Sequence, residues 1–179
     1  MNLMLKSIRI STFVFLLSAA CVVTSAAQET RGPAADFYEA TKAAPAAFKA
    51  GDMSKAALLS HNLLKQAETF KDNWNYGNAV HVANLVLGRI ALVNKEPDKA
   101  RVYLLDAGRT PGSPQLNSFG PNMLLASEML EIGESKAVLE YFDLCAKFWD
   151  PEHSSLEVWR ADIKNGKAPK FGANLRYQF

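Results

Sequence analysis

Apolar residues recur every three or four positions through the centre of the chain. Between residues 79 and 93 they fall at Ala79, Val82, Val86, Ile90 and Val93. This spacing places them on one face of a helix, and further apolar residues widen the stripe, so we expect neighbours on more than one side. Pro97 then suits the first turn of a new helix, and Asp98 adds negative charge where the helix dipole favours it. Gly108 is a natural stop. The pattern predicts two packed helices over residues 79–107.

The same period continues on both sides of this central pair. It predicts further helices over the ranges 34–50, 56–70, 121–132, 135–149 and 154–163. Pro45 is expected to kink or divide the first of them. The stretch 108–120 is the least helical part, since it holds two prolines and three glycines, and it is predicted to be a long connection. The fold class predicted from the sequence is therefore all-α.

A short phrase recurs at three of the predicted turns between helices. Its copies are Gly-Asp-Met-Ser-Lys-Ala at 51–56, Glu-Pro-Asp-Lys-Ala at 96–100 and Gly-Glu-Ser-Lys-Ala at 133–137. Each copy gives a turn, an acidic residue near a helix start and a Lys-Ala pair in the first turn. One helical hairpin cannot bury its own apolar face, so recurring turns of this kind indicate stacked antiparallel hairpins.

Small residues of the central pair carry a resemblance to a known family. The Leu87-Gly88 pair is followed twelve positions after the glycine by Ala100, and this spacing resembles the tetratricopeptide repeat. In that family the leucine-glycine pair packs against the alanine of the second helix. The family's usual tryptophan three residues before the leucine is Asn84 here. The resemblance covers about 30 residues. It implies a solenoid of about three hairpins plus a capping helix. In such a solenoid the first helix of each hairpin lines a concave surface that takes up peptides or helices.

The first 27 residues have the pattern of a cleaved signal peptide. Lys6 and Arg9 form a basic start, residues 10–23 are apolar, and small residues follow up to Ala27. The apolar run is short for a membrane span. Cleavage near Ala27 predicts an exported protein, periplasmic or secreted, with a helical domain over 28–166 and an irregular tail over 167–179.

Cys21 supports a competing interpretation of the leader. Ala20 precedes it as in a lipoprotein cleavage box, although Ser18 stands where that box usually has leucine. Lipidation at Cys21 would anchor the domain to a membrane without changing its fold. Cleavage near Ala27 is the favoured alternative.

Charge offers no hint of a nucleic-acid partner. The chain has 20 Lys and Arg against 18 Asp and Glu, and the leader alone holds the two extra basic residues. The mature chain is therefore balanced, which argues against nucleic-acid binding.

No catalytic or metal-binding motif is present in the sequence. Cys145 is the single cysteine after the leader and lies in an apolar helical run, so it is expected to be a small buried core residue. His61 and His81 could approach each other across a hairpin, but no third ligand stands at a supporting spacing. We therefore expect no enzyme activity, no metal and no cofactor.

The resemblance to the tetratricopeptide repeat implies binding positions on one face of the central helix. Val82, Leu85, Arg89 and Leu92 would line its groove, with Arg89 exposed and able to pair a carboxylate. The alternative is that Val82 and Leu85 belong to the core, and this alternative is slightly favoured. The Lys/Asn pattern by which some tetratricopeptide proteins clamp a carboxylate is absent.

The connection 108–120 is the second candidate region. It either lines one end of a groove or is a plain connection whose Leu116 and Phe119 plug the core, and the second interpretation is favoured. The candidate binding residues are Arg89, Leu85, Leu92, Asn117, Ser118 and Phe119.

The sequence thus predicts a protein- or peptide-binding or scaffold module of the cell envelope, with no transmembrane helix in the mature chain. The alternative is a periplasmic protein that binds a small ligand or metal through His61, His81 and Arg89. A binding module predicts an exposed concave stripe, whereas a small-ligand protein predicts a deep pocket with converging polar groups.

Overall fold

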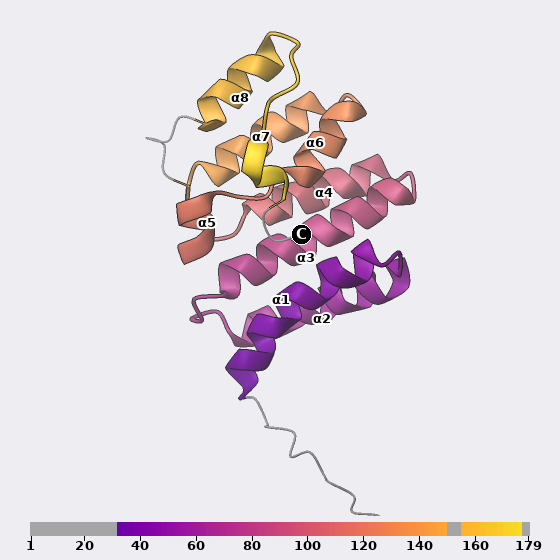
Figure 1. Ribbon diagram of the computed structural model, residues 1–179, viewed down its shortest axis with the longest axis vertical. Coiled ribbons are helices and arrows are strands. Elements are labelled where there is room, and N and C mark those ends of the chain that lie inside the picture. Colours follow the sequence, from indigo (N-terminus) through magenta and orange to yellow (C-terminus); the bar gives the residue numbers. More distant parts are fainter. Residues whose placement is uncertain (1–31, 150–154, 177–179) are drawn as a thin grey trace, which may run out of the picture. The chain divides into compact units, whose positions relative to one another are not determined.

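The computed structural model describes residues 32–149 and 155–176 of the chain, all within the compact unit Arg31–Phe179. Every regular element in these ranges is a helix, which confirms the all-α prediction (Figure 1). The helices are α1 (Pro33–Lys49), α2 (Met53–Thr69), α3 (Tyr76–Val93), α4 (Pro97–Gly108), α5 (Pro114–Phe119), α6 (Leu124–Glu131), α7 (Ser135–Cys145), α8 (Ser155–Lys164) and the short 3-10 helix η2 (Gly172–Leu175). The predicted leader and Cys21 lie outside the described residues. None of the described helices is both long and apolar enough to cross a membrane.

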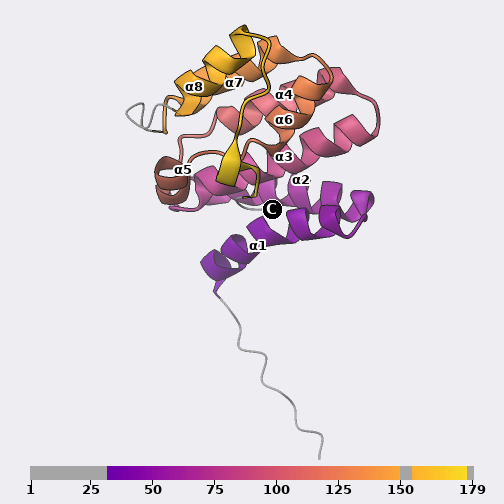
Figure 2. The same ribbon diagram turned by 45° about the horizontal axis from the view of Figure 1, so that its top comes forward.

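Contacts between the helices largely follow their order in the chain. Helix α1 packs on α2, and α3 contacts both of them before packing on α4. Helices α6 and α7 pack on each other and on α4, and α8 packs on α7 (Figures 1 and 2). Thirteen of the 18 residues of α3 are buried. The widened apolar stripe of the sequence therefore matches a helix with neighbours on several sides.

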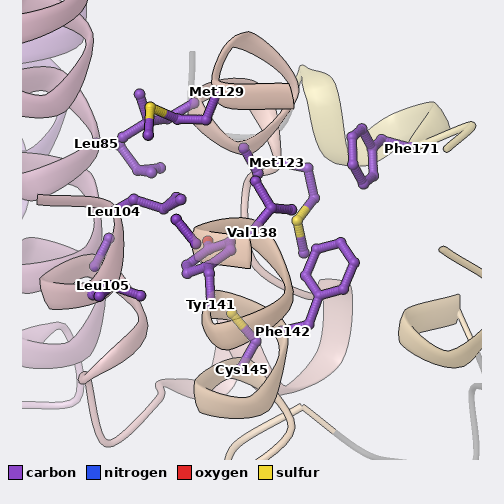
Figure 3. Packing of buried hydrophobic residues seen from close by; sticks show 14 of the residues in the cluster. Leu85, Leu104, Leu105, Met123, Met129, Val138, Tyr141, Phe142, Cys145 and Phe171 are labelled. Atoms are coloured by element: carbon purple, nitrogen blue, oxygen red, sulfur yellow. The ribbon is translucent and has the colours of Figure 1, made fainter. Parts of the chain in front are cut away.

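The largest core lies among α3, α4, α6 and α7. Figure 3 shows Leu85, Leu104, Met129 and Tyr141 converging on it from these four helices. Cys145 is completely buried there, which confirms its expected place in the core, and burial raises the pKa of its thiol. A cysteine without contact with water in this way is a packing residue rather than a reactive one.

The last described residues return to this core instead of trailing away from it. Phe171 is buried and lies edge-on to the Trp159 ring, with 4.9 Å between centroids. The Met123 amide donates to the Asn174 carbonyl at 2.8 Å, and the Asn174 side chain donates to the Phe119 and Pro121 carbonyls. The packed structure therefore continues past residue 166, where the sequence predicted an irregular tail to begin.

The recurring phrase of the sequence forms the same turn three times. One residue of each turn has a positive φ: Gly51 (81°), Lys95 (60°) and Gly133 (85°). The next amide in each case donates to a carbonyl five residues earlier: Asp52 to Ala47, Glu96 to Ala91 and Glu134 to Met129. This is the hydrogen bond of a Schellman C-cap. The following helices then bury their first alanines: Ala56, Ala100 and Ala137.

Lys95 is the one non-glycine residue with a positive φ in the described part of the chain. A side chain in this conformation is strained, so Lys95→Gly is expected to raise the free energy of unfolding by about 1 kcal/mol. Urea unfolding measures it. The matched control is Lys65→Gly on an exposed position inside α2, where glycine is expected to lower stability by about 1 kcal/mol. A change in the free energy of unfolding that has the same sign in both variants would contradict strain at Lys95.

Three predicted elements differ from the structure. Helix α1 continues through Pro45, which is buried, because packing against α2 and α3 holds the helix together despite the missing amide hydrogen. The helix expected from Pro121 begins only at Leu124, since Asn122 turns its side chain to cap the Leu124 amide. The helix expected to reach Trp149 ends at Cys145 and continues as turns.

The connection 108–120 is not a plain loop, because it contains the six-residue helix α5. Ser113 caps its start, with the hydroxyl oxygen accepting from the Leu116 amide at 3.0 Å, and Pro114 occupies the first turn. Gly120 ends it at a positive φ of 82°. Leu116 is completely buried, as the core-plugging interpretation expected, but Phe119 is 63% exposed and does not plug the core.

Candidate functional site

One face of α3 carries the positions that the sequence proposed for a groove. Asn78, Val82, Leu85, Arg89 and Leu92 fall within an arc of about 80° on this helix. In the middle of the face, Leu85 is 0% exposed and Val82 is 2% exposed, so Leu85 is a core residue and cannot contact a partner. The groove prediction is wrong for Leu85, and the alternative that both residues belong to the core is correct. The surface is hollowed at the two ends of this face.

The hollow at the C-terminal end of α3 is here called the turn groove. Its volume is about 670 Å³, and its lining residues are Phe48, Arg89, Leu92, Val93, Lys95, Pro97, Glu128, Glu131, Ile132 and Glu134. They come from α1, α3 and α6, from the turns that follow α3 and α6, and from the first residue of α4. Val93 and Ile132 are more than half exposed. Exposed apolar side chains gathered in a concave surface are typical of a binding site.

Arg89 forms part of the floor of the turn groove instead of offering a charge to a ligand. Its Nε donates to both carboxylate oxygens of Glu128 at 2.9 Å, and its Nη2 donates to Glu128 Oε1 at 2.6 Å. The guanidinium also lies 4.4 Å from the centroid of the Phe48 ring, and its side chain is only 18% exposed. The expectation of an exposed Arg89 that pairs an external carboxylate is therefore wrong. The guanidinium of Arg89 on α3 instead contacts Phe48 of α1 and Glu128 of α6.

The remaining charges of the turn groove lie on its rim. Glu134 accepts from Arg101 at 3.0 and 3.1 Å, and this hydrogen bonding lowers the pKa of Glu134. Lys95 and Glu131 are exposed, and neither forms an ion pair with the residues that the structure describes. The groove thus offers exposed apolar side chains beside the paired Arg89 and Glu128, and one unpaired charge of each sign.

The hollow at the other end of the α3 face is here called the carboxamide cavity. Its volume is about 240 Å³, and its lining residues are Tyr38, Thr41, Lys42, Asn75, Asn78, Val82 and Gln115. Asn78 Nδ2 donates to Asn75 Oδ1 and to Gln115 Oε1, both at 3.0 Å. Ser113 Oγ donates to Asn78 Oδ1 at 2.7 Å. Polar groups from α1, α3 and α5 therefore converge on one small space.

The sequence analysis did not single out the residues of this cavity. Asn75 and Asn78 belong to the short run Asn-Trp-Asn-Tyr-Gly-Asn at 73–78, which lies between the predicted helices over 56–70 and 79–107. Three asparagines in six residues beside a glycine are the one signal that could have marked the site.

The candidate residues of α5 lie outside both hollows. Asn117, Ser118 and Phe119 are exposed, and Asn117 Oδ1 accepts from the Ser113 amide at 3.2 Å. Helix α5 contributes Gln115 to the carboxamide cavity instead. Of the six candidate residues, the structure brings only Arg89 and Leu92 together.

The two histidines do not share a site. His81 is completely buried, with Nδ1 3.0 Å from the Ala107 carbonyl and Nε2 accepting from the Asn122 amide at 3.1 Å. His61 is exposed on α2. Within the described ranges, no group of three or more His, Cys, Asp or Glu side chains could hold a metal ion.

Comparisons with models of protein families, with curated proteins and with solved structures found no match. The resemblance to the tetratricopeptide repeat therefore stays a prediction from the residues of α3 and α4. A function is therefore inferred from the two hollows and from the side chains that line them.

Proposed function

We propose that this protein is an exported, non-catalytic binding module whose turn groove takes up a segment of another protein. The observation that carries the proposal is the pair of exposed apolar side chains, Val93 and Ile132, that line one concave surface together with half-buried Leu92. Burying these side chains against a partner is favourable at roughly 25 cal/mol per Å² of apolar surface. The proposed location, periplasmic or secreted, depends on the leader sequence alone.

The proposal includes a stack of antiparallel hairpins, α1 with α2, α3 with α4 and α6 with α7, capped by α8. The three turns that share one hydrogen-bond pattern support it, as does the order of the helix contacts. Gly88 also supports close packing of α3 on its neighbours, because a Cβ atom there would lie 3.3 Å from Tyr103 Cβ of α4 and would overlap Leu125 Cδ2 of α6. In such a stack, α1, α3 and α6 are the first helices, and all three line the turn groove.

The groove indicates the chemistry of its partner. Arg89 is already paired with Glu128, so a terminal carboxylate gains no available arginine there. Lys95 and Glu131 instead suit a segment whose apolar side chains are flanked by one acidic and one basic residue. The second candidate function, binding of a small ligand, is supported by the carboxamide cavity and is developed below. A metal site at His61 and His81 is not proposed further, because both ring nitrogens of His81 are engaged.

A displayed library of random peptides tests the turn groove. The exported protein is purified and used to select peptides, which are expected to carry apolar residues. Val93→Glu and Ile132→Glu each place a charge among the apolar contacts, so each is expected to weaken binding of the selected peptides about tenfold or more. Fluorescence anisotropy of labelled peptides measures the affinity.

The matched control is Val102→Glu on α4. Val102 is 54% exposed, close to the 57% of Val93, and does not line the turn groove. This variant is expected to bind the selected peptides as the wild type does. The proposal fails if the selection yields no peptide, or if all three variants bind equally.

A further inference from the structure

The carboxamide cavity contains a buried donor without an acceptor. Asn75 is 1% exposed, and no hydrogen-bond partner for its Nδ2 exists among the described residues. Its Oδ1 accepts from Asn78 Nδ2, so reversing the Asn75 amide would place two NH2 groups against each other. Buried polar groups are nearly always hydrogen-bonded, and an exception of this kind calls for an explanation.

A ligand in the cavity can supply the missing acceptor, because Asn75 lines this space. Gln115 lines it as well and accepts from Asn78 through Oε1, which leaves its Nε2 as a second amide donor. Thr41 donates its hydroxyl hydrogen to the Tyr38 carbonyl, so its oxygen remains able to accept. The cavity therefore suits a ligand with several groups that both accept and donate, which is the property of hydroxyl groups.

Charge favours a neutral ligand over an anion. Lys42 is the one charged residue among the described residues that line the cavity. Its Nζ already pairs with Glu39 at 3.1 Å and lies 4.3 Å from the centroid of the Tyr38 ring. A lysine that is paired in this way offers little net attraction to a carboxylate or a phosphate.

One aromatic ring lines the cavity, and a second ring lies next to the first. Tyr38 lines the cavity, and its ring centroid lies 5.5 Å from that of Trp74, the residue before Asn75. Both rings are partly exposed, Tyr38 at 37% and Trp74 at 49%. A half-exposed aromatic ring presents an apolar face, and a ligand with hydroxyl groups on its edge and C–H groups on its face can use both features.

We propose that the carboxamide cavity binds one sugar ring, either a free monosaccharide or the end unit of a glycan chain. A volume of about 240 Å³ is below the roughly 300–1,000 Å³ of pockets for drug-sized ligands, so the cavity takes one small unit. In the complex, Asn75 Nδ2 and Gln115 Nε2 donate to sugar oxygens, and the Tyr38–Trp74 pair lies against the C–H face of the ring. This site is separate from the turn groove. A positive or negative result for sugar binding therefore does not decide whether the turn groove binds a peptide.

Nuclear magnetic resonance on the ¹⁵N-labelled exported protein tests the site. The probes are glucose and N-acetylglucosamine at up to about 50 mM, which detects dissociation constants in the millimolar range. The side-chain amide signals of Asn75 and the indole signal of Trp74 are expected to shift in a saturable manner. A trisaccharide of N-acetylglucosamine separates the two sources, because tighter binding than the monosaccharide identifies a chain end and equal binding identifies a free sugar.

Two variants and one control connect the signals to the cavity. Asn75→Asp keeps the acceptor that Asn78 uses and removes the unpartnered donor, so binding is expected to weaken about tenfold or more. Trp74→Ala changes an exposed side chain, leaves folding intact and is expected to weaken binding about three- to tenfold. Leu58→Ala, an exposed position on α2 that does not line the cavity, is expected to leave binding unchanged.

The outcomes are distinct. Saturable shifts whose affinity falls in Asn75→Asp and in Trp74→Ala and is unchanged in Leu58→Ala support the site. An N-acetylated, amidated dipeptide serves as the competing probe, and shifts with this peptide but with no sugar would overturn the sugar in favour of a peptide carbonyl. The absence of shifts with every probe would overturn the proposal and assign the cavity to water.

Discussion

Lowering the pH from 7 to 5 is expected to destabilise the protein by about 2 kcal/mol through one buried histidine. Burial lowers the pKa of His81 from 6.5 to about 4, against a smaller opposite effect of its hydrogen bond to the Ala107 carbonyl. Nε2 accepts from the Asn122 amide, so the buried ring is neutral with its hydrogen on Nδ1. Between pH 6.5 and 4 the unfolded chain binds a proton at His81 that the folded chain does not bind. The free energy of unfolding therefore falls as the pH falls through this window.

The other titrating groups contribute little between pH 7 and 5. The pKa of Glu134 is lowered by its hydrogen bonds to Arg101, so the stability from this pair is lost as the pH falls from the usual pKa of a glutamate through the lowered pKa. Cys145 and Tyr141 are neutral, because burial raises the pKa values of both. A loss of stability that begins near pH 6.5, before the carboxylates titrate, thus identifies a histidine.

His81→Gln and His61→Gln form the matched pair of variants. His81→Gln removes the titrating ring, so its lower stability is expected to be nearly constant from pH 7 to 5. His61→Gln changes an exposed side chain on α2 and is expected to keep the full pH dependence of the wild type. Urea unfolding followed by circular dichroism at pH 7, 6 and 5 measures both. Equal stability of the wild type at pH 7 and 5 would contradict a buried neutral His81.

The helices that the sequence predicted best are those whose burial shows in their period. Helix α3 presents apolar residues over most of its turns, and the structure buries it on nearly all sides. Helix α5 was missed because six residues are too few to display a period. Its signals were the capping Ser113, the following proline and the closing Gly120, which are visible in the sequence but also occur in ordinary loops.

The candidate site was predictable only in part, because it depends on contacts between distant residues. Helical spacing placed Arg89 and Leu92 on one face of α3 correctly. It could not reveal that Glu128, 39 positions later, neutralises Arg89, since this pair depends on how α6 packs against α3. The carboxamide cavity has the same origin, because Asn78 meets Gln115 across 37 positions and Ser113 across 35.

Gly77→Ala is expected to destabilise the protein by about 3 kcal/mol or more. Gly77 lies in the first turn of α3, and a Cβ atom there would overlap the carbonyl of Gly112 and come within 2.8 Å of Thr110 Oγ1. The contact is with backbone, which cannot rotate away as a flexible side chain can. Thr110 Oγ1 donates to the Gly77 carbonyl at 3.1 Å, so moving this segment away from the added methyl group would break the hydrogen bond.

The segment around Gly112 cannot move aside to relieve this clash. Gly112 has a φ of 88°, and the side chains of Asn117 and Phe148 crowd its other side. Thermal unfolding of Gly77→Ala is compared with that of Gly32→Ala, where no atom lies within 4 Å of the added methyl group and the loss is expected to stay below about 1 kcal/mol. A Gly77→Ala variant as stable as Gly32→Ala would show that residues 110–113 do not pack against the start of α3. The same packing places Gln115 in the carboxamide cavity, so that result would remove one wall of the proposed sugar site as well.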